Sequence, residues 1–192
     1  IQSDHGWGHL LELIDALNQH PDRIDSVLNV DRALWMHALN YALINFDSYV
    51  GYAQNYYLYR DGDGLWNTIP WDMNMSFGAF RLSDASNYWN GFSVAQAMNM
   101  NPLSHYSSVS VFPRPLMRAL FNDPMRRRMY LAHLRAIMDE HIASDTYYQL
   151  AQQLRAVIDP HVQADANKFY SYQGFLDNLD AQVSFTIAYP GL

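Results

Sequence analysis

The 192-residue chain contains no cysteine and only one lysine, Lys168, beside eleven arginines. The absence of cysteine excludes disulfide bonds, a thiolate nucleophile and a zinc site with cysteine ligands. No run of about 18 apolar residues is present, so no segment is predicted to span a membrane. No targeting signal is recognisable in the sequence.

Charge is also scarce, since charged residues make up 16% of the chain and the net charge is −7. This balance argues against a broad basic surface, and we therefore expect no nucleic-acid partner. Hydrophobic residues make up 49% and aromatic residues 15%, which is enough apolar material for a substantial core and is atypical of disorder. The length suits one domain or one large lobe, so we treat residues 1–192 as a single unit.

Apolar periodicity predicts a predominantly helical chain. The most informative segment begins at Asp31, the expected N-cap, and runs to about Ile44. Its apolar residues cover nearly the whole circumference, which is typical of a buried helix. Further helices are predicted over residues 9–18, 22–28, 113–121, 123–141, 144–158 and 175–187. Residues 74–111 are expected to form loops and short helices.

A β-hairpin is predicted in the middle of the chain. The aromatic run Tyr56–Arg60 and the segment Leu65–Ile69 are strand candidates. Asp61-Gly62-Asp63-Gly64 between them is a strong turn signal, and Pro70 ends the second strand. Helices together with one hairpin predict an α+β, predominantly α-helical fold.

Three polar residues flank this hairpin. Asp47 follows the buried helix, Asn55 precedes the first strand and Asp72 follows the second. Protein kinases use this order in their C-terminal lobe, with a catalytic Asp, a metal-binding Asn and a second Asp that holds Mg²⁺. Mg²⁺ prefers hard oxygen ligands. Because Asn55 and Asp72 border the same hairpin, we expect them to meet in space although 17 positions separate them.

The amino-acid sequence around these residues resembles that of the CotH family of spore-coat, kinase-like proteins. The segments that carry the resemblance are Asn45-Phe46-Asp47-Ser48-Tyr49, Gln54-Asn55-Tyr56-Tyr57-Leu58-Tyr59 and Ile69-Pro70-Trp71-Asp72-Met73-Asn74-Met75-Ser76-Phe77-Gly78. The resemblance implies a protein-kinase-like C-terminal lobe whose hairpin carries the metal site. It also implies ATP as substrate, Mg²⁺ or Mn²⁺, and transfer of phosphate to Ser or Thr of a protein substrate at a cell surface or after secretion.

The resemblance assigns a role to each site residue. Asp47 is expected to be the catalytic base that orients the substrate hydroxyl. Asn55 and Asp72 are expected to bind the metal and, through it, the nucleotide. Asn74 is expected to be a weak metal ligand, because it stands where the family usually has a second Asp. A neutral ligand at this position weakens metal binding.

The sequence departs from a complete kinase in a second respect. No Lys precedes Lys168 and no glycine-rich loop precedes Asp47, although a kinase needs both to hold ATP. We therefore expect the N-terminal lobe to be a partner absent from this chain, and the chain alone to be inactive. The alternative is a surface structural or adhesion protein with a catalytically degenerate kinase fold.

Simpler interpretations exist for several features. Asp47, Asn55 and Asp72 could each stabilise a local turn or loop backbone. His5 and His9 have the i, i+4 spacing of a metal-binding pair, but chance spacing or a surface pair explains them better. A calcium loop starting at Asp72 is disfavoured because the required Gly and Glu are absent. Solvated charges are expected for the arginines at 126, 127 and 128, and core packing rather than a carbohydrate platform for the aromatic residues at 56, 57, 59, 66 and 71.

Overall fold

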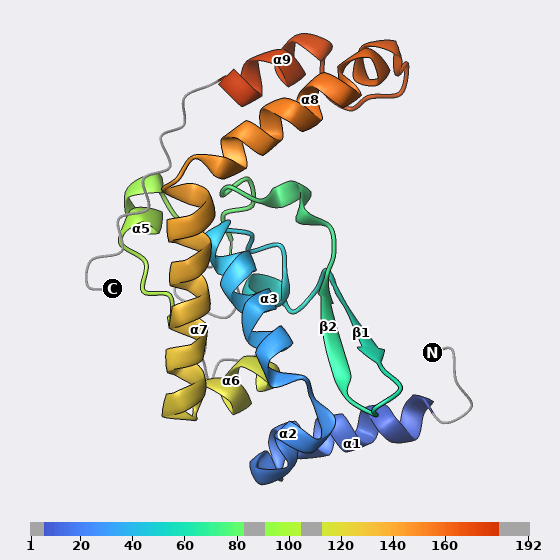
Figure 1. The fold of residues 1–192 in the computed structure, drawn as a ribbon, viewed down its shortest axis with the longest axis vertical. Coiled ribbons are helices and arrows are strands. Elements are labelled where there is room, and N and C mark those ends of the chain that lie inside the picture. The colour runs from blue at the N-terminus through green and yellow to red at the C-terminus, as the bar shows by residue number, and fades with distance from the viewer. Residues whose placement is uncertain (1–5, 83–90, 105–112, 181–192) are drawn as a thin grey trace. The chain divides into compact units, whose positions relative to one another are not determined.

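The computed structural model describes residues 6–82, 91–104 and 113–180 (Figure 1). These residues belong to two compact units, one up to residue 135 and one from residue 136 onward. The single lobe over residues 1–192 stays a prediction. In the described part of the chain, no helix is both long and apolar enough to cross a membrane.

The first unit holds most of the secondary structure. Its elements are α1 (Gly6–Asn18), a 3-10 turn (Pro21–Arg23), α2 (Ile24–Val27), α3 (Val30–Ala42), α4 (Tyr49–Tyr52), β1 (Tyr56–Arg60), β2 (Trp66–Pro70), a second 3-10 turn (Met73–Met75), α5 (Val94–Met98), α6 (Pro115–Phe121) and α7 (Pro124–Ile137). The second unit contains the last two residues of α7, a π-helical turn (Met138–Ile142), α8 (Thr146–Ala164) and α9 (Tyr172–Asp180). The α+β, predominantly helical prediction is confirmed in this coarse form, whereas the kinase-like lobe stays a prediction.

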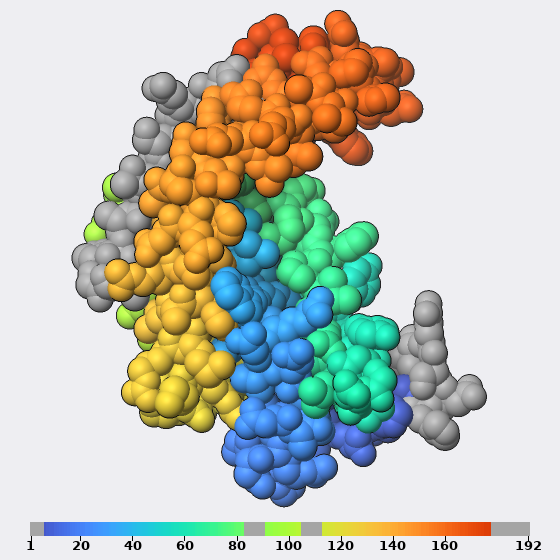
Figure 2. Space-filling model, in the orientation of Figure 1, coloured from blue at the N-terminus to red at the C-terminus, as the bar shows by residue number. Residues whose placement is uncertain are grey.

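Helix α3 is the centre of the first unit. It lies between α7 and the hairpin (Figure 1), and in Figure 2 the side chains of these three elements form adjacent bands on one face. Leu34, Ala38 and Tyr41 are buried on it, as the apolar pattern predicted. The predicted N-cap is wrong by two residues, because the side chain of Asn29, not Asp31, accepts the hydrogen bond from Arg32 N at 3.1 Å.

The hairpin forms as predicted and packs on α3. Strands β1 and β2 are antiparallel, with Tyr56 opposite Pro70 and Arg60 opposite Trp66. In the turn, Asp61 Oδ1 accepts hydrogen bonds from the backbone of Asp63 and Leu65. The hydrogen bond from the Asn67 side chain is the main reason that the pKa of Asp61 lies below its usual range. Asp61 is thus a turn residue, as the sequence indicated.

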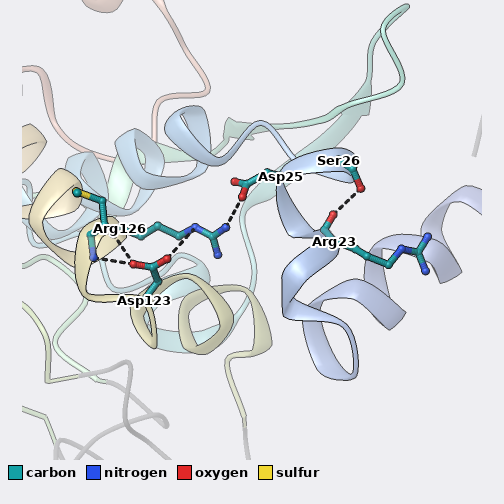
Figure 3. Close-up of polar contacts among 6 residues, drawn as sticks. Arg23, Asp25, Ser26, Asp123 and Arg126 are labelled. Atoms are coloured by element: carbon teal, nitrogen blue, oxygen red, sulfur yellow. Dashed lines mark hydrogen bonds and ion pairs between the residues drawn. The ribbon is translucent and has the colours of Figure 1, made fainter.

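One of the three consecutive arginines was assigned wrongly. The Arg126 side chain is only 12% exposed and its Nη2 donates to Asp25 Oδ2 at 2.7 Å, which joins α7 to α2 (Figure 3). Asp123 caps α7, since its Oδ1 accepts from Met125 N at 2.6 Å. Sequence spacing could not reveal the pair of Arg126 and Asp25, because the two residues lie 101 positions apart.

Two further expectations need correction. Helix α8 continues through Pro160 to Ala164 instead of ending at Ile158, although a proline inside a helix removes one backbone hydrogen bond and crowds the preceding turn. Tyr57, Tyr59 and Trp71 are 52%, 59% and 55% exposed, so they do not pack in the core. The predicted helix 175–187 begins at Tyr172, and its residues beyond 180 lie outside the described part, as does His5.

Candidate functional site

Asp47 and Asn55 lie in direct contact at the two ends of the loop that contains α4. Asn55 Nδ2 donates to the main-chain oxygen of Asp47 at 2.7 Å and to its carboxylate Oδ2 at 3.1 Å. Gln54 Nε2 donates to the other carboxylate oxygen, Oδ1. Each oxygen of this half-buried carboxylate therefore accepts an amide N–H, which orients Asp47 within the loop.

The orientation of the Asn55 amide follows from its partners. Asp47 offers only hydrogen-bond acceptors to it, so the amide nitrogen and not the oxygen must face Asp47. The Asn55 side-chain oxygen is consequently directed away from Asp47 and has no hydrogen-bond donor among the described residues. A half-buried carbonyl oxygen in this position can bind a cation.

Asp72 reaches the same place through the hairpin. Trp71 N donates to Asn55 O at 3.1 Å, which extends the β1–β2 ladder by one pair beyond Tyr56 and Pro70. Asp72 is the next residue along the chain and is exposed. Its carboxylate, like the exposed side chain of Asn74, makes no hydrogen bond or ion pair within the described residues.

The loop after Asp72 is tied to the end of α3, from which Asp47 also emerges. Phe77 N donates to Leu43 O at 2.6 Å and Gly78 N to Ile44 O at 3.2 Å. The buried Asn45 side chain contacts Met73 Sδ through its Nδ2 at 3.3 Å. The structure thus brings Asp47, Asn55 and the segment that carries Asp72 and Asn74 to one end of the hairpin.

The backbone around these residues adopts an uncommon conformation. Asn55 and Asp72 have φ of 55° and 51°, and Ala53, Ile44 and Phe77 are also left-handed. For an L-residue this conformation costs about 1–2 kcal/mol, although Asn and Asp tolerate it better than most. Such residues cluster at functional sites, where the surrounding structure holds them in place.

A buried arginine that the sequence did not reveal supports the same loop. Arg114 is 2% exposed and donates from Nε to Tyr49 O at 2.9 Å and from Nη2 to Gly51 O at 2.6 Å. The sequence signal at Arg114 was its position between Pro113 and Pro115, because a residue before proline is restricted to extended conformations. This signal indicates the backbone conformation of Arg114 but not its burial. Nothing local indicates that its partner lies 65 positions away.

A groove of about 1020 Å³ runs beside the site, between the start of α1 and strand β1. Gln54 and Asn55, which directly precede β1, line this groove. Tyr56, Tyr57 and Tyr59 of β1 contribute aromatic surface to it. Burial raises the pKa of the Tyr56 phenol, which therefore stays neutral at physiological pH. The groove offers a largely apolar surface next to the polar site.

The donor set at this end of the hairpin suits a hard divalent cation. The Asn55 side-chain oxygen and the Asp72 carboxylate are oxygen donors without hydrogen-bond partners among the described residues, and Mg²⁺ commonly uses one or two carboxylates together with substrate phosphates and water. No group of three or more His, Cys, Asp or Glu residues that could hold a metal occurs in the described residues.

The family model described as CotH kinase protein matches residues 1–189. The chain belongs to the CotH kinase family. A comparison with curated proteins finds no match. Membership makes this a kinase-like protein and confirms the resemblance first seen in the segments around Asp47, Asn55 and Asp72.

Proposed function

We propose that this CotH family chain is the C-terminal lobe of a protein kinase that transfers the γ-phosphoryl group of ATP to Ser or Thr of a protein. The observation that carries the proposal is the position of Asn55. Its side chain bonds to Asp47 and its main chain bonds to Trp71, the neighbour of Asp72. One residue therefore connects the three positions that phosphoryl transfer requires.

Each residue has a distinct part in this proposal. Asp47, oriented by two amide donors, accepts the proton of the substrate hydroxyl as the hydroxyl oxygen attacks the γ-phosphorus. The bond from the γ-phosphorus to the β–γ bridging oxygen breaks in the same step, and ADP leaves. Asn55 Oδ1 and the Asp72 carboxylate would hold Mg²⁺ or Mn²⁺, and Asn74 would add a weak neutral ligand. When bound, the cation neutralises charge on the phosphate oxygens.

The remaining parts of the ATP site are proposed to come from an N-terminal lobe. The groove beside Asn55 offers aromatic surface for the base and ribose, but a kinase also needs a Lys to grip the phosphates. The sole lysine, Lys168, lies in the second unit. Tyr57, Tyr59 and Trp71 are more than half exposed and offer apolar surface on which such a lobe can pack.

Two substitutions in the full-length protein test the proposal, with radiolabelled phosphate transfer to a generic protein substrate as the assay. Asp72→Ala should remove transfer that depends on Mg²⁺ or Mn²⁺ and weaken Mn²⁺ binding. Asp47→Asn should slow transfer by about 100-fold or more, as expected for loss of a positioned base, while nucleotide binding stays within about twofold. Asp63→Ala is the control, because Asp63 is an exposed turn residue of the same hairpin.

A second candidate is supported by Asn74. A neutral side chain in the place of a second Asp lowers the charge of the metal site, which favours a kinase fold retained for a structural or adhesive role at the cell surface. If the unsubstituted full-length protein binds no nucleotide and transfers no phosphate with either metal, this second function replaces the first. If transfer occurs and Asp72→Ala leaves it unchanged, the metal assignment is wrong.

A further inference from the structure

Helix α4, in the loop between Asp47 and Asn55, is too short to satisfy its own carbonyl groups. It has four residues, Tyr49–Tyr52, and ends at Ala53 in a left-handed conformation. The last carbonyls of any helix lack partners within it, and a buried carbonyl without a donor is destabilising. Here Arg114 donates to Gly51 O, which accepts no hydrogen bond from α4 itself, and also to Tyr49 O, which accepts a second hydrogen bond from Ala53 N at 3.2 Å.

The same loop is also closely packed against the chain that precedes it. A Cβ on Gly51 would lie 2.0 Å from Phe46 O, so the backbone passes Phe46 at a distance that only glycine permits. The Tyr49 hydroxyl accepts a hydrogen bond from Leu116 N at 2.8 Å. The first turn of α6 and the residue before it therefore hold α4 through contacts that are distant in sequence.

These contacts fix a strained conformation. Ala53 and Asn55 both have positive φ, 54° and 55°, and such conformations persist only where the surrounding structure determines them. The Asn55 side chain reaches Asp47 from this conformation. If α4 were released from Arg114, Ala53 and Asn55 could relax, and the Asn55 amide would lose its position relative to Asp47.

We infer that Arg114 is a positioning residue for phosphoryl transfer, acting through the main chain of α4 on Asp47 and Asn55. The inference rests on the proposed function. Arginine suits the task because its planar guanidinium donates in two directions at once. Lysine carries the same charge but has a single ammonium group, so it should restore the arrangement only in part.

The test compares Arg114→Met, Arg114→Lys and a matched control, Arg126→Met, in the full-length protein. Arg126 also has a largely buried side chain and joins two elements, but it bonds to Asp25 and not to the loop between Asp47 and Asn55 (Figure 3). Thermal melts, kcat and KM for ATP, and hydrogen exchange of peptides that cover residues 49–55 are measured at a temperature where each variant is folded. Peptides from α7 provide the reference for exchange.

Arg114→Met should lower kcat by about 10- to 100-fold, since small displacements of reacting groups have effects of this size, with KM for ATP within about twofold. Exchange at Tyr52 and Ala53, whose amides bond to Ser48 O and Tyr49 O, should become at least about tenfold faster. Arg114→Lys should be intermediate, and Arg126→Met should lower the melting temperature without changing kcat or exchange in residues 49–55.

Failure of this inference can be told apart from failure of the proposed function. If the unsubstituted protein transfers no phosphate, the proposed function fails, and exchange in residues 49–55 alone decides whether Arg114 holds the loop. If the unsubstituted protein is active and Arg114→Met keeps its kcat, the positioning role is overturned. Equal losses of kcat in Arg114→Met and Arg126→Met would also overturn it, because general destabilisation would then explain both.

Discussion

His37 occupies an unusual position for a titratable side chain. It is fully buried on α3, and neither ring nitrogen has a hydrogen-bond partner among the described residues. Its neighbours are aromatic, with the ring centroid of Tyr49 at 5.5 Å and that of Phe121 at 5.9 Å. Burial lowers the pKa of His37 from 6.5 to about 3, because the imidazolium cannot be hydrated in this environment.

The sign of the pH effect follows from this lowered pKa. Above pH 6.5 the ring is neutral in both the folded and the unfolded chain, and the full stability is present. Between pH 6.5 and about 3 the unfolded chain binds a proton that the folded chain does not, so the free energy of unfolding decreases as the pH falls. The slope is about 1.4 kcal/mol per pH unit, which amounts to about 2 kcal/mol between pH 6.5 and 5.

His37→Leu isolates this contribution. The substitution removes two buried polar atoms that lack partners, so stability at pH 7.5 should be unchanged or higher. It should also remove about 2 kcal/mol of the loss between pH 7.5 and 5. All five tryptophans precede residue 135, so urea unfolding followed by tryptophan fluorescence reports on the first unit.

His161→Leu is the control, because His161 is an exposed histidine on α8. Other groups titrate in the same pH range, but their contributions cancel when the two variants and the unsubstituted protein are compared. The reasoning is refuted if the His37→Leu protein loses as much stability between pH 7.5 and 5 as the unsubstituted protein does. That result would mean that His37 is solvated or paired in solution.

Two further predictions concern the candidate site. Asn74→Asp should tighten Mn²⁺ binding by on the order of tenfold, because it adds a negative charge to the proposed metal site; titration calorimetry measures this, and unchanged affinity would remove Asn74 from the proposed ligand set. Gly51→Ala should destabilise the protein by at least about 2 kcal/mol, since the new Cβ would lie 2.0 Å from Phe46 O, and a thermal melt equal to that of the unsubstituted protein would contradict the close approach.

Features encoded by neighbouring residues could be predicted from the sequence. Strand β1 has the predicted bounds, because an aromatic run next to an Asp-Gly turn specifies a hairpin locally. Hairpin pairing then places Asn55 beside Trp71, which is why Asn55 and the segment of Asp72 could be expected to meet. The contact between Asp47 and Asn55 spans eight positions, and the sequence indicated that they share a loop but not that they bond directly.

Features that depend on distant residues could not be predicted. Asn29 replaces Asp31 as the cap of α3, and the Asn29 side chain also bonds to Asn67, 38 positions away. Arg126 reaches Asp25, and Arg114 reaches α4, over separations that no local pattern encodes. The exposure of Tyr57, Tyr59 and Trp71 likewise depends on what packs over the hairpin, whereas aromatic composition alone favoured burial.

The distribution of backbone strain favours the enzyme over the structural alternative. In the described part of the chain, five of the six non-glycine residues with positive φ lie between Ile44 and Phe77, and the sixth is Asp145. At about 1–2 kcal/mol each, they oppose a total stability that is only about 5–15 kcal/mol for a typical domain. A hairpin and a buried helix can be joined by unstrained turns, so a purely structural role does not require this concentration. The proposed site requires such strain, because it must hold an amide, a carboxylate and a metal ligand in fixed relation. The buried Arg114 supports the strained loop, and strained conformations persist only where the surrounding structure holds them.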